Sequence, residues 1–155
     1  MTEYLSDLII IFNDYYHTKY LGALTMSAGN AGRSFATMCA ALDVRGVVVM
    51  PDSAPEASAQ AIERLGASVV RTPGPELLAT ASELARSENL TLVHPFDDVD
   101  LIAGHASCGI EILEDLPTLG EDDCVVVCCG GGGLVSGVAA VSYNCLHKLF
   151  LVYGM

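Results

Sequence analysis

The chain has 155 residues, of which 52% are hydrophobic, and it carries a formal net charge of −12 at pH 7. Its seven Lys and Arg residues are scattered, so neither nucleic acid nor an anionic membrane surface is expected as a partner, because both require clustered positive charge. The length fits one domain, or one and a half, with enough apolar residues for a substantial core.

Apolar runs alternate with helix-like segments from residue 21 onward, whereas residues 1–20 fit neither pattern and remain unassigned. The patterns predict strands at 22–26, 46–51, 67–72, 90–95, 122–129 and 148–154, and helices at 30–43, 54–66, 74–88, 97–116 and 134–143. In the first of these helices, the spacing places four side chains on one side, those of Phe35, Met38, Cys39 and Leu42.

This alternation with short connections is typical of an α/β protein with a mostly parallel sheet. The continuous valine runs at 47–49 and 125–127 indicate strands that are covered on both faces. A turn-rich acidic segment at 116–123 marks a modest domain boundary.

Four consecutive glycines, Gly130, Gly131, Gly132 and Gly133, lie between a predicted strand and a predicted helix. Glycine is costly to order, so a run of four needs a reason. A helix N-terminus at the carboxyl end of a parallel strand offers unpaired N–H groups, and phosphate uses them best. We interpret residues 130–134 as an anion cradle, with close packing of the backbone as the alternative.

The sequence after the glycines narrows the choice of phosphate ligand. Leu134 and Val135 stand where a nucleotide-binding P-loop needs Lys and then Ser or Thr, and the dinucleotide pattern GxGxxG fails. A single phosphate on a compact cofactor remains.

A second motif, SAGNAGRSFA at 27–36, also follows a short apolar run and opens a helix. Ser27 and Asn30 bring a hydroxyl and an amide to the helix N-terminus, where N-capping alone would justify them. Two anion-favouring helix starts in one α/β chain can instead hold the two ends of one ligand assembly.

The six cysteines form no CxxC pair and no zinc-ligand spacing with histidines, so no metal site is expected. Their apolar neighbours indicate free thiols in a reducing cytosol, and the acidic first residues do not suit a secretory signal. The glycines and valines within 124–141 argue against a membrane span there. Together with the free thiols, this predicts a cytoplasmic protein.

Taken in order, the motifs SAGNAG, VVVMPDSAPEASAQAIERLGASVV, HPFDD, GHAS and GGGGL resemble the fold-type II pyridoxal-phosphate enzymes. Within that group the chain is most similar to the serine/threonine dehydratases, also called ammonia-lyases, over residues 23–141. The resemblance implies a three-layer, parallel-sheet, tryptophan-synthase-beta-like α/β fold. It also implies a small domain at 21–116 and, at 117–155, part of the large domain that binds the cofactor phosphate.

The resemblance implies site residues as well. The phosphate of pyridoxal 5′-phosphate would be held by the four glycines at 130–133 and the Leu134 N–H, and its ring 3′-oxygen by Asn30. The carboxylate of a serine or threonine substrate would be received by Ser27, Gly29 and Ala31. Three further residues match family positions but serve equally well as helix-start residues: Asp97, Asp98 and His105.

Ala28 bears on the reaction that the resemblance implies. The similar racemases carry at this position a serine that acts as acid or base, whereas alanine has no proton to give. The chain therefore looks more like a dehydratase, which releases a 2-oxo acid and ammonia, than like a racemase.

The chain departs from the family at the lysine that bonds the cofactor, which lies in a Ser-Phe-Lys-like motif well before the Ser-x-Gly-Asn segment. Only Lys19 and Lys148 occur here, and the family's C-terminal half is missing, so no catalytic residue is assigned. Two hypotheses remain. One is a pyridoxal-phosphate-dependent L-serine/L-threonine dehydratase, a lyase of amino acid metabolism. The other, favoured by the missing lysine, is a non-catalytic truncated fragment, at most a phosphate-binding or partner domain.

With so little of the large domain present, we expect an exposed apolar patch at 125–127 and 150–152 and an unpaired strand edge. Such a surface favours association, for example into a homodimer.

Overall fold

The computed structural model describes residues 22–119, 123–142 and 149–153. The unassigned segment 1–20 and both lysines, Lys19 and Lys148, lie outside the described residues. The chain divides into two compact units, with the boundary in the sequence between Val93 and His94. This division differs from the boundary expected after residue 116, because helix α5 (Val99–Asp115) packs against helix α6 (Gly133–Ser142) in the second unit.

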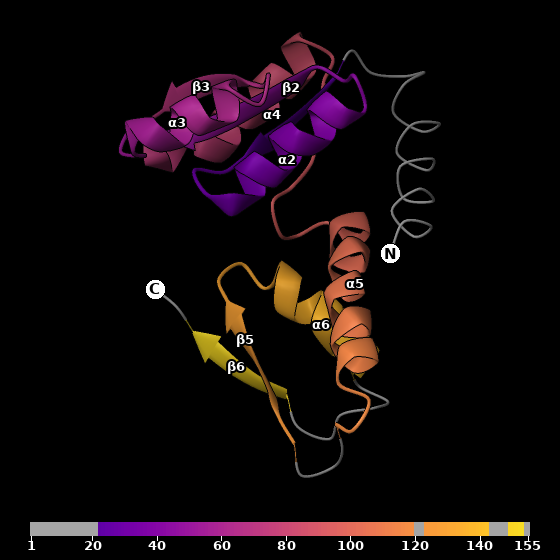
Figure 1. The fold of residues 1–155 in the computed structure, drawn as a ribbon. Helices are drawn as coiled ribbons and strands as arrows, with labels where there is room; N and C mark the ends of the chain where they lie inside the picture. Colours follow the sequence, from indigo (N-terminus) through magenta and orange to yellow (C-terminus); the bar gives the residue numbers. More distant parts are fainter. Residues whose placement is uncertain (1–21, 120–122, 143–148, 154–155) are drawn as a thin grey trace. The chain divides into compact units, whose positions relative to one another are not determined.

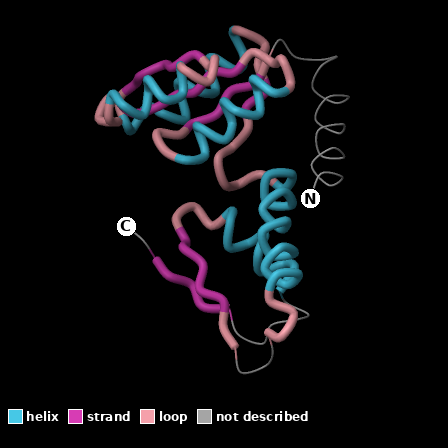
Figure 2. Tube along the Cα trace, in the orientation of Figure 1, coloured by secondary structure: helices cyan, strands magenta, loops and turns pink. Residues whose placement is uncertain are grey.

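In the first unit, helices pack on a β-sheet (Figures 1 and 2). The sheet has four parallel strands in the order β3-β2-β1-β4. Its strands are β1 (Ala23–Met26), β2 (Gly46–Pro51), β3 (Ser68–Thr72) and β4 (Thr91–Leu92). The strands are connected by helices α2 (Asn30–Ala41), α3 (Glu56–Glu63) and α4 (Leu77–Ser87), the last preceded by the 3-10 turn η1 (Gly74–Glu76). The predicted α/β alternation with a parallel sheet is confirmed.

Strand β2 shows why helices lie on both faces of this sheet. Val48 and Met50 pack with side chains of α2 and α3, whereas Val47 and Val49 pack on the opposite face with Ala81 of α4. All four β2 side chains are buried. Because successive strand residues point to opposite faces, a continuous apolar run is what a strand covered on both sides requires.

Strand β4 is shorter than the strand predicted at 90–95. The pairing with β1 continues only through Val93, whose N–H donates to Leu24 O at 2.8 Å and whose carbonyl accepts from the Thr25 hydroxyl at 2.8 Å. Pro95 has no N–H with which to extend the ladder. The chain therefore leaves the sheet just before the segment HPFDD.

The second unit contains α5, β5 (Val125–Cys129), α6 and β6 (Leu149–Tyr153), with β5 and β6 paired in parallel. Helix α6 covers one face of β5, where Val127 packs with Val135 and Val138. On the other face Val126 is 59% exposed. The predicted exposed patch is thus confirmed at Val126 and wrong at Val127, which is buried; the side chains of 150–152 lie outside the described residues.

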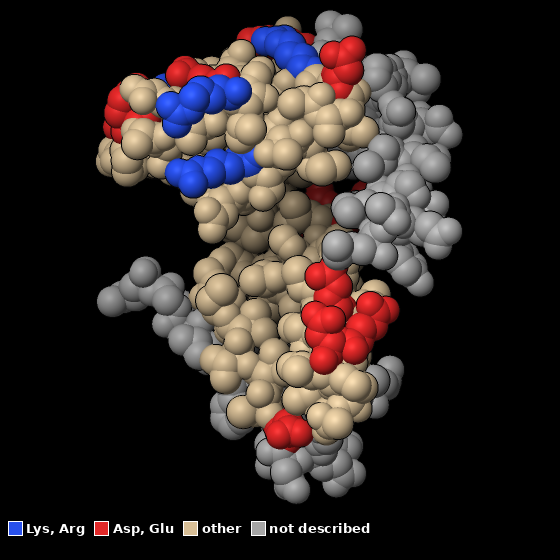
Figure 3. All heavy atoms as spheres, in the orientation of Figure 1, with Lys and Arg blue, Asp and Glu red and all other residues tan. Residues whose placement is uncertain are grey.

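Charge is distributed unevenly over the two units. Every arginine of the chain lies in the first unit, and the described residues of the second unit include no Lys or Arg. In the view of Figure 3 the basic side chains accordingly lie only over the sheet and helices of the first unit. Within residues 22–119, 123–142 and 149–153, no helix is long and apolar enough to cross a membrane.

Candidate functional site

Residues 27–31 form the turn between β1 and α2 in the first unit. The Ser27 N–H donates to Val49 O at 3.0 Å, which extends the pairing of β1 with β2 by one residue. The Ser27 Oγ accepts from the Gly29 N–H at 3.2 Å. Gly32 allows this turn to pass close to the helix, since a Cβ there would stand 2.9 Å from Ser27 O and 3.1 Å from Ile62 Cδ1. The second glycine of the motif is therefore required by packing.

The N-terminus of α2 has no side-chain cap. Gly29 occupies the N-cap position, so the alternative interpretation of Ser27 and Asn30 as capping residues is wrong. The first backbone bond at this helix end runs from the Arg33 N–H to Gly29 O. The N–H groups of residues 30–32 consequently have no acceptor within the helix. Together with the positive end of the helix dipole, these donors suit a carboxylate or another anion.

The glycine run lies in the second unit, where β5 ends at Cys129 and α6 begins at Gly133. The predicted turn between strand and helix is confirmed. Gly132 has φ +94°, a conformation that other residues rarely adopt, and a Cβ at Gly130 or at Gly132 would meet no atom within 4 Å. These two glycines therefore face open space at the start of a helix.

The other two glycines are packed closely against Phe96. A Cβ on Gly131 would overlap the Phe96 ring, and a Cβ on Gly133 would stand 2.8 Å from Phe96 O and 3.0 Å from Phe96 Cα. The alternative of close packing thus holds for Gly131 and Gly133. Phe96 is not among the site residues that the sequence predicts, although it stands in the segment HPFDD.

The loop as a whole fits a phosphate group. The Ser136 N–H donates to Gly132 O at 2.9 Å, so the N–H groups of Gly133, Leu134 and Val135 precede the first bonded turn of α6 and have no acceptor within that helix. Gly130 and Gly132 bring no side chain to the loop, and a Cβ at either position would meet no atom within 4 Å. The described part of this unit has no Lys or Arg, and among those residues the backbone donors and the helix dipole are the groups that attract an anion.

The segment before α5 is held by its own polar groups. The Asp97 N–H donates to His94 Nδ1 at 2.9 Å, and the Asp98 carboxylate caps α5 by accepting from the N–H groups of Asp100 at 2.9 Å and Leu101 at 3.1 Å. The interpretation of Asp98 as a helix cap is confirmed. His105 lies on α5, and its Cβ would stand 2.6 Å from a Cβ on Gly137, so this histidine packs against α6.

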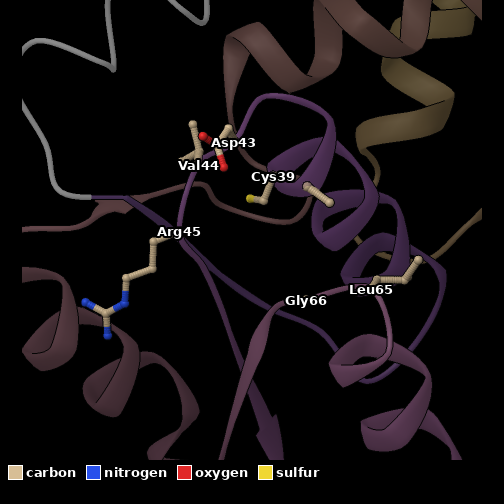
Figure 4. Close-up of a pocket in the computed structure, with 7 residues that line it drawn as sticks. Cys39, Asp43, Val44, Arg45, Leu65 and Gly66 are labelled. Carbon is tan, nitrogen blue, oxygen red and sulfur yellow. The ribbon is translucent and has the colours of Figure 1, made fainter.

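A separate pocket of about 230 Å³ lies in the first unit, at the edge where strands β2 and β3 begin (Figure 4). Its lining is mixed, with apolar walls, the thiol of Cys39 and the charged residues Asp43 and Arg45. Burial raises the pKa of the Cys39 thiol to about 11, which keeps it protonated and unreactive at neutral pH. Arg45 forms an ion pair with Glu88. The pocket contains none of the predicted site residues.

No group of three or more His, Cys, Asp or Glu side chains in the described part of the chain is arranged to hold a metal ion. The predicted site residues fall into two sets, with Ser27, Gly29, Asn30 and Ala31 in the first unit and the glycine run with Leu134 in the second.

Comparison with known proteins supplies the family context. The profile of the family described as pyridoxal-phosphate dependent enzymes matches residues 11–147. The catabolic L-threonine dehydratase TdcB of Staphylococcus aureus (strain USA300) is 37% identical over an alignment of 131 residues, which covers 81% of this chain and 37% of that protein. The chain thus spans little more than a third of the length of this relative.

Two solved structures are similar over nearly the whole chain. A pyridoxal 5′-phosphate-dependent aspartate racemase matches with a TM-score of 0.85 and 31% identity, covering 93% of this chain and 44% of that one. The processed form of threonine deaminase isoform 2 from Solanum lycopersicum matches with a TM-score of 0.80 and 30% identity, covering 94% and 43%. The predicted tryptophan-synthase-beta-like fold is confirmed for the part of that fold which this chain contains.

Proposed function

This chain belongs to the pyridoxal-phosphate-dependent enzyme family, and from that premise we propose that it serves in the conversion of L-serine or L-threonine to a 2-oxo acid and ammonia. The observation that carries the proposal is the glycine loop, in which Gly130 and Gly132 face open space beside the free N–H groups at the start of α6. The similarity to a catabolic L-threonine dehydratase supports the same reaction class.

The glycine loop holds the cofactor phosphate in this proposal. The donors are the backbone N–H groups of residues 130–133 and of Leu134, and the dipole of α6 adds a partial positive charge. The left-handed conformation of Gly132 turns the chain so that the helix begins directly after the loop. When bound, the cofactor supplies an electron sink for the amino acid's carbanion.

The turn at 27–31 provides the polar groups for the rest of the ligand. Ser27, Gly29 and Ala31 receive the substrate carboxylate, and the Asn30 side-chain amide donates to the cofactor's 3′-oxygen. Support comes from the uncapped start of α2, where no side chain of the helix competes for the first N–H groups. Asn30 and Ala31 are exposed and therefore available to a ligand.

Ala28 favours elimination over racemisation. Racemisation needs a base on one side of the α-carbon to remove its proton and an acid on the other side to return one, whereas removal of the hydroxyl group needs one base and assistance to the leaving group. The methyl group of Ala28 neither donates nor accepts a proton. This position therefore supports a dehydratase, although the solved relatives include a racemase.

A second candidate function is a phosphate-binding or partner domain without catalysis. The observation in its favour is that no described residue is a lysine, and that neither Lys19 nor Lys148 lies in a motif of the family's type. A lysine amine is the nucleophile with which such enzymes bond the cofactor carbonyl.

One pair of variants tests the proposed site. Gly130→Ala puts a methyl group into the open space of the loop without strain, and Gly74→Ala does the same in η1, far along the sequence from the loop. We expect Gly130→Ala to weaken the binding of pyridoxal phosphate, measured by equilibrium dialysis of the full chain, at least tenfold. Gly74→Ala should bind as the wild type does, and both variants should keep its unfolding midpoint. Unchanged binding by Gly130→Ala would remove the loop from the site.

The reaction itself is tested with L-threonine and L-serine. Formation of the 2-oxo acid, together with a stoichiometric pyridoxyl adduct on Lys19 or Lys148 after borohydride reduction and mass spectrometry, would support the dehydratase. Binding without adduct or turnover would support the phosphate-binding domain. A homodimer, which the exposed face of β5 favours, is to be tested in the same samples by sedimentation.

A further inference from the structure

Phe96 packs directly on the glycine loop. Its ring lies on the Cα of Gly131, where no Cβ fits, and its backbone lies against Gly133. The ring also makes an edge contact with His94, with centroids 4.7 Å apart and planes at 87°. His94 in turn accepts a hydrogen bond from the Asp97 N–H.

A loop of four glycines has many accessible conformations, and an anion site built from backbone N–H groups works only in the few that point those groups at one place. Where a Lys or Arg supplies part of the attraction, a poorly ordered loop can still bind. The described residues of this unit contain neither. For the attraction that the backbone N–H groups supply, affinity depends on how well the loop is held before the ligand arrives.

The position of the Phe96 ring also argues against a role in the core alone. Phe96 is 42% exposed and does not belong to the buried cluster of Val127, Val135 and Val138 between β5 and α6. A phenylalanine kept at the surface loses part of the hydrophobic benefit of its burial. Its contacts include the loop and His94.

We propose that Phe96 is a positioning residue for the glycine loop: its ring, seated on Gly131, holds the loop in the conformation that binds a phosphate. Gly131 is fixed by the ring, while its neighbours Gly130 and Gly132 remain open to the ligand. The proposal rests on the proposed function of the loop as a phosphate site. The Phe96 side chain has no hydrogen-bond donor for the phosphate.

The first test uses inorganic phosphate and pyridoxal phosphate as separate probes, titrated into the full chain by calorimetry. Phe96→Ala should lower the affinity for both probes by about tenfold or more. Phe96→Tyr, which keeps the ring, should bind both with affinities within about twofold of the wild type. Val99→Ala, at an 81% exposed position three residues further along, is the matched control and should change neither. Loss of affinity for pyridoxal phosphate alone would show that the ring contacts the cofactor and does not order the loop, which would overturn the proposal.

The second test is a double-mutant cycle that needs no ligand. Gly131→Ala places a methyl group into the Phe96 ring, so it should raise the amide hydrogen-exchange rate of the loop at 130–134 by about tenfold. In the Phe96→Ala background the methyl group has room, and the same substitution should change exchange by less than threefold. Equal effects in the two backgrounds would overturn the proposal.

These two tests separate the failure of the inference from the failure of the proposed function. If the wild type binds neither probe, the phosphate site is wrong, while a coupled cycle would still show that Phe96 orders the loop. If the wild type binds both probes and Phe96→Ala binds them equally well, the phosphate site stands and the role of Phe96 is wrong. Circular dichroism of each variant excludes loss of the fold as the cause.

Discussion

A Cβ on Gly137 of α6 would stand 2.6 Å from the carbonyl oxygen of Ile102 in α5, so the two helices meet where there is no room for a methyl group. Gly109 of α5 also faces α6 but with more space, since its Cβ would lie 3.1 Å from Val141 Cβ and 3.2 Å from Val138 O. This crossing fixes α6, and with it the start of the helix that follows the glycine loop.

We expect Gly137→Ala to lower the free energy of unfolding of the second unit by about 1–3 kcal/mol, because the added methyl group meets backbone atoms that cannot move aside cheaply. This cost exceeds the gain in helix propensity, which is about 1 kcal/mol. Gly109→Ala gains as much helix propensity and makes milder contacts, so its free energy of unfolding should stay within about 1 kcal/mol of the wild type. Urea unfolding followed by circular dichroism measures both, and equal losses would contradict the difference in space.

Gly132 and Gly66 form a second matched pair, because their φ angles are +94° and +93° and a Cβ at either position would meet no atom within 4 Å. Replacing either by alanine should cost about 1 kcal/mol or more of stability through backbone strain alone. Only Gly132 belongs to the loop, so only Gly132→Ala should also weaken the binding of inorganic phosphate, by about tenfold or more. A comparable loss of binding in Gly66→Ala would mean that general destabilisation, and not loop geometry, controls affinity.

Much of the fold follows from sequence patterns in which a single physical requirement dominates. Strand β2 has the predicted bounds, since an unbroken apolar run fits one environment, a strand covered on both sides. The buried face of α2 is predicted less well. Cys39 is buried and Phe35 packs against the core, as predicted, but Met38 is 37% exposed, and the other buried positions are Gly32 and Ala36. Periodicity favours large apolar residues, whereas close contact with the sheet and with α3 selects small ones.

The candidate site shows the same division. The glycine run and the motif at 27–31 could be predicted because backbone donors at helix starts have a strong sequence signature. Phe96 could not, since an isolated aromatic residue has no pattern, and only its position on Gly131 reveals its contact with the loop. Similarly, the unit boundary after Val93 depends on the packing of α5 on α6, which the acidic turn at 116–123 does not indicate.

Cys39 makes a prediction for the alkaline range. Burial raises its pKa from 9.0 to about 11, so between these pH values the folded protein keeps a proton that the unfolded chain releases. The corresponding stability is fully present below pH 9 and is lost as the pH rises to about 11. The free energy of unfolding should fall by up to about 3 kcal/mol over this interval. The free energy of unfolding of Cys39→Ala should fall less steeply with pH. That of Cys108→Ala, at an exposed position, should follow the wild type. Parallel curves for Cys39→Ala and the wild type would contradict this assignment.

The uncovered face of β5 makes the last prediction. Val127 is buried beneath α6, but Val126, on the opposite face of the strand, is 59% exposed. The two neighbouring residues on the same face as Val126, Cys124 and Cys128, are exposed as well. An apolar strand face without a covering layer favours association with another copy of the chain.

Val126→Ser should therefore lower the fraction of dimer or larger species in sedimentation experiments under reducing conditions. The matched control is Leu78→Ser, at a 55% exposed position on α4. Because the side chain of Val126 is largely in solvent, its replacement should leave the unfolding midpoint of the monomer nearly unchanged. If the wild type is monomeric at the concentrations used for binding, or if Leu78→Ser dissociates it as effectively as Val126→Ser does, this face of β5 is not the contact surface.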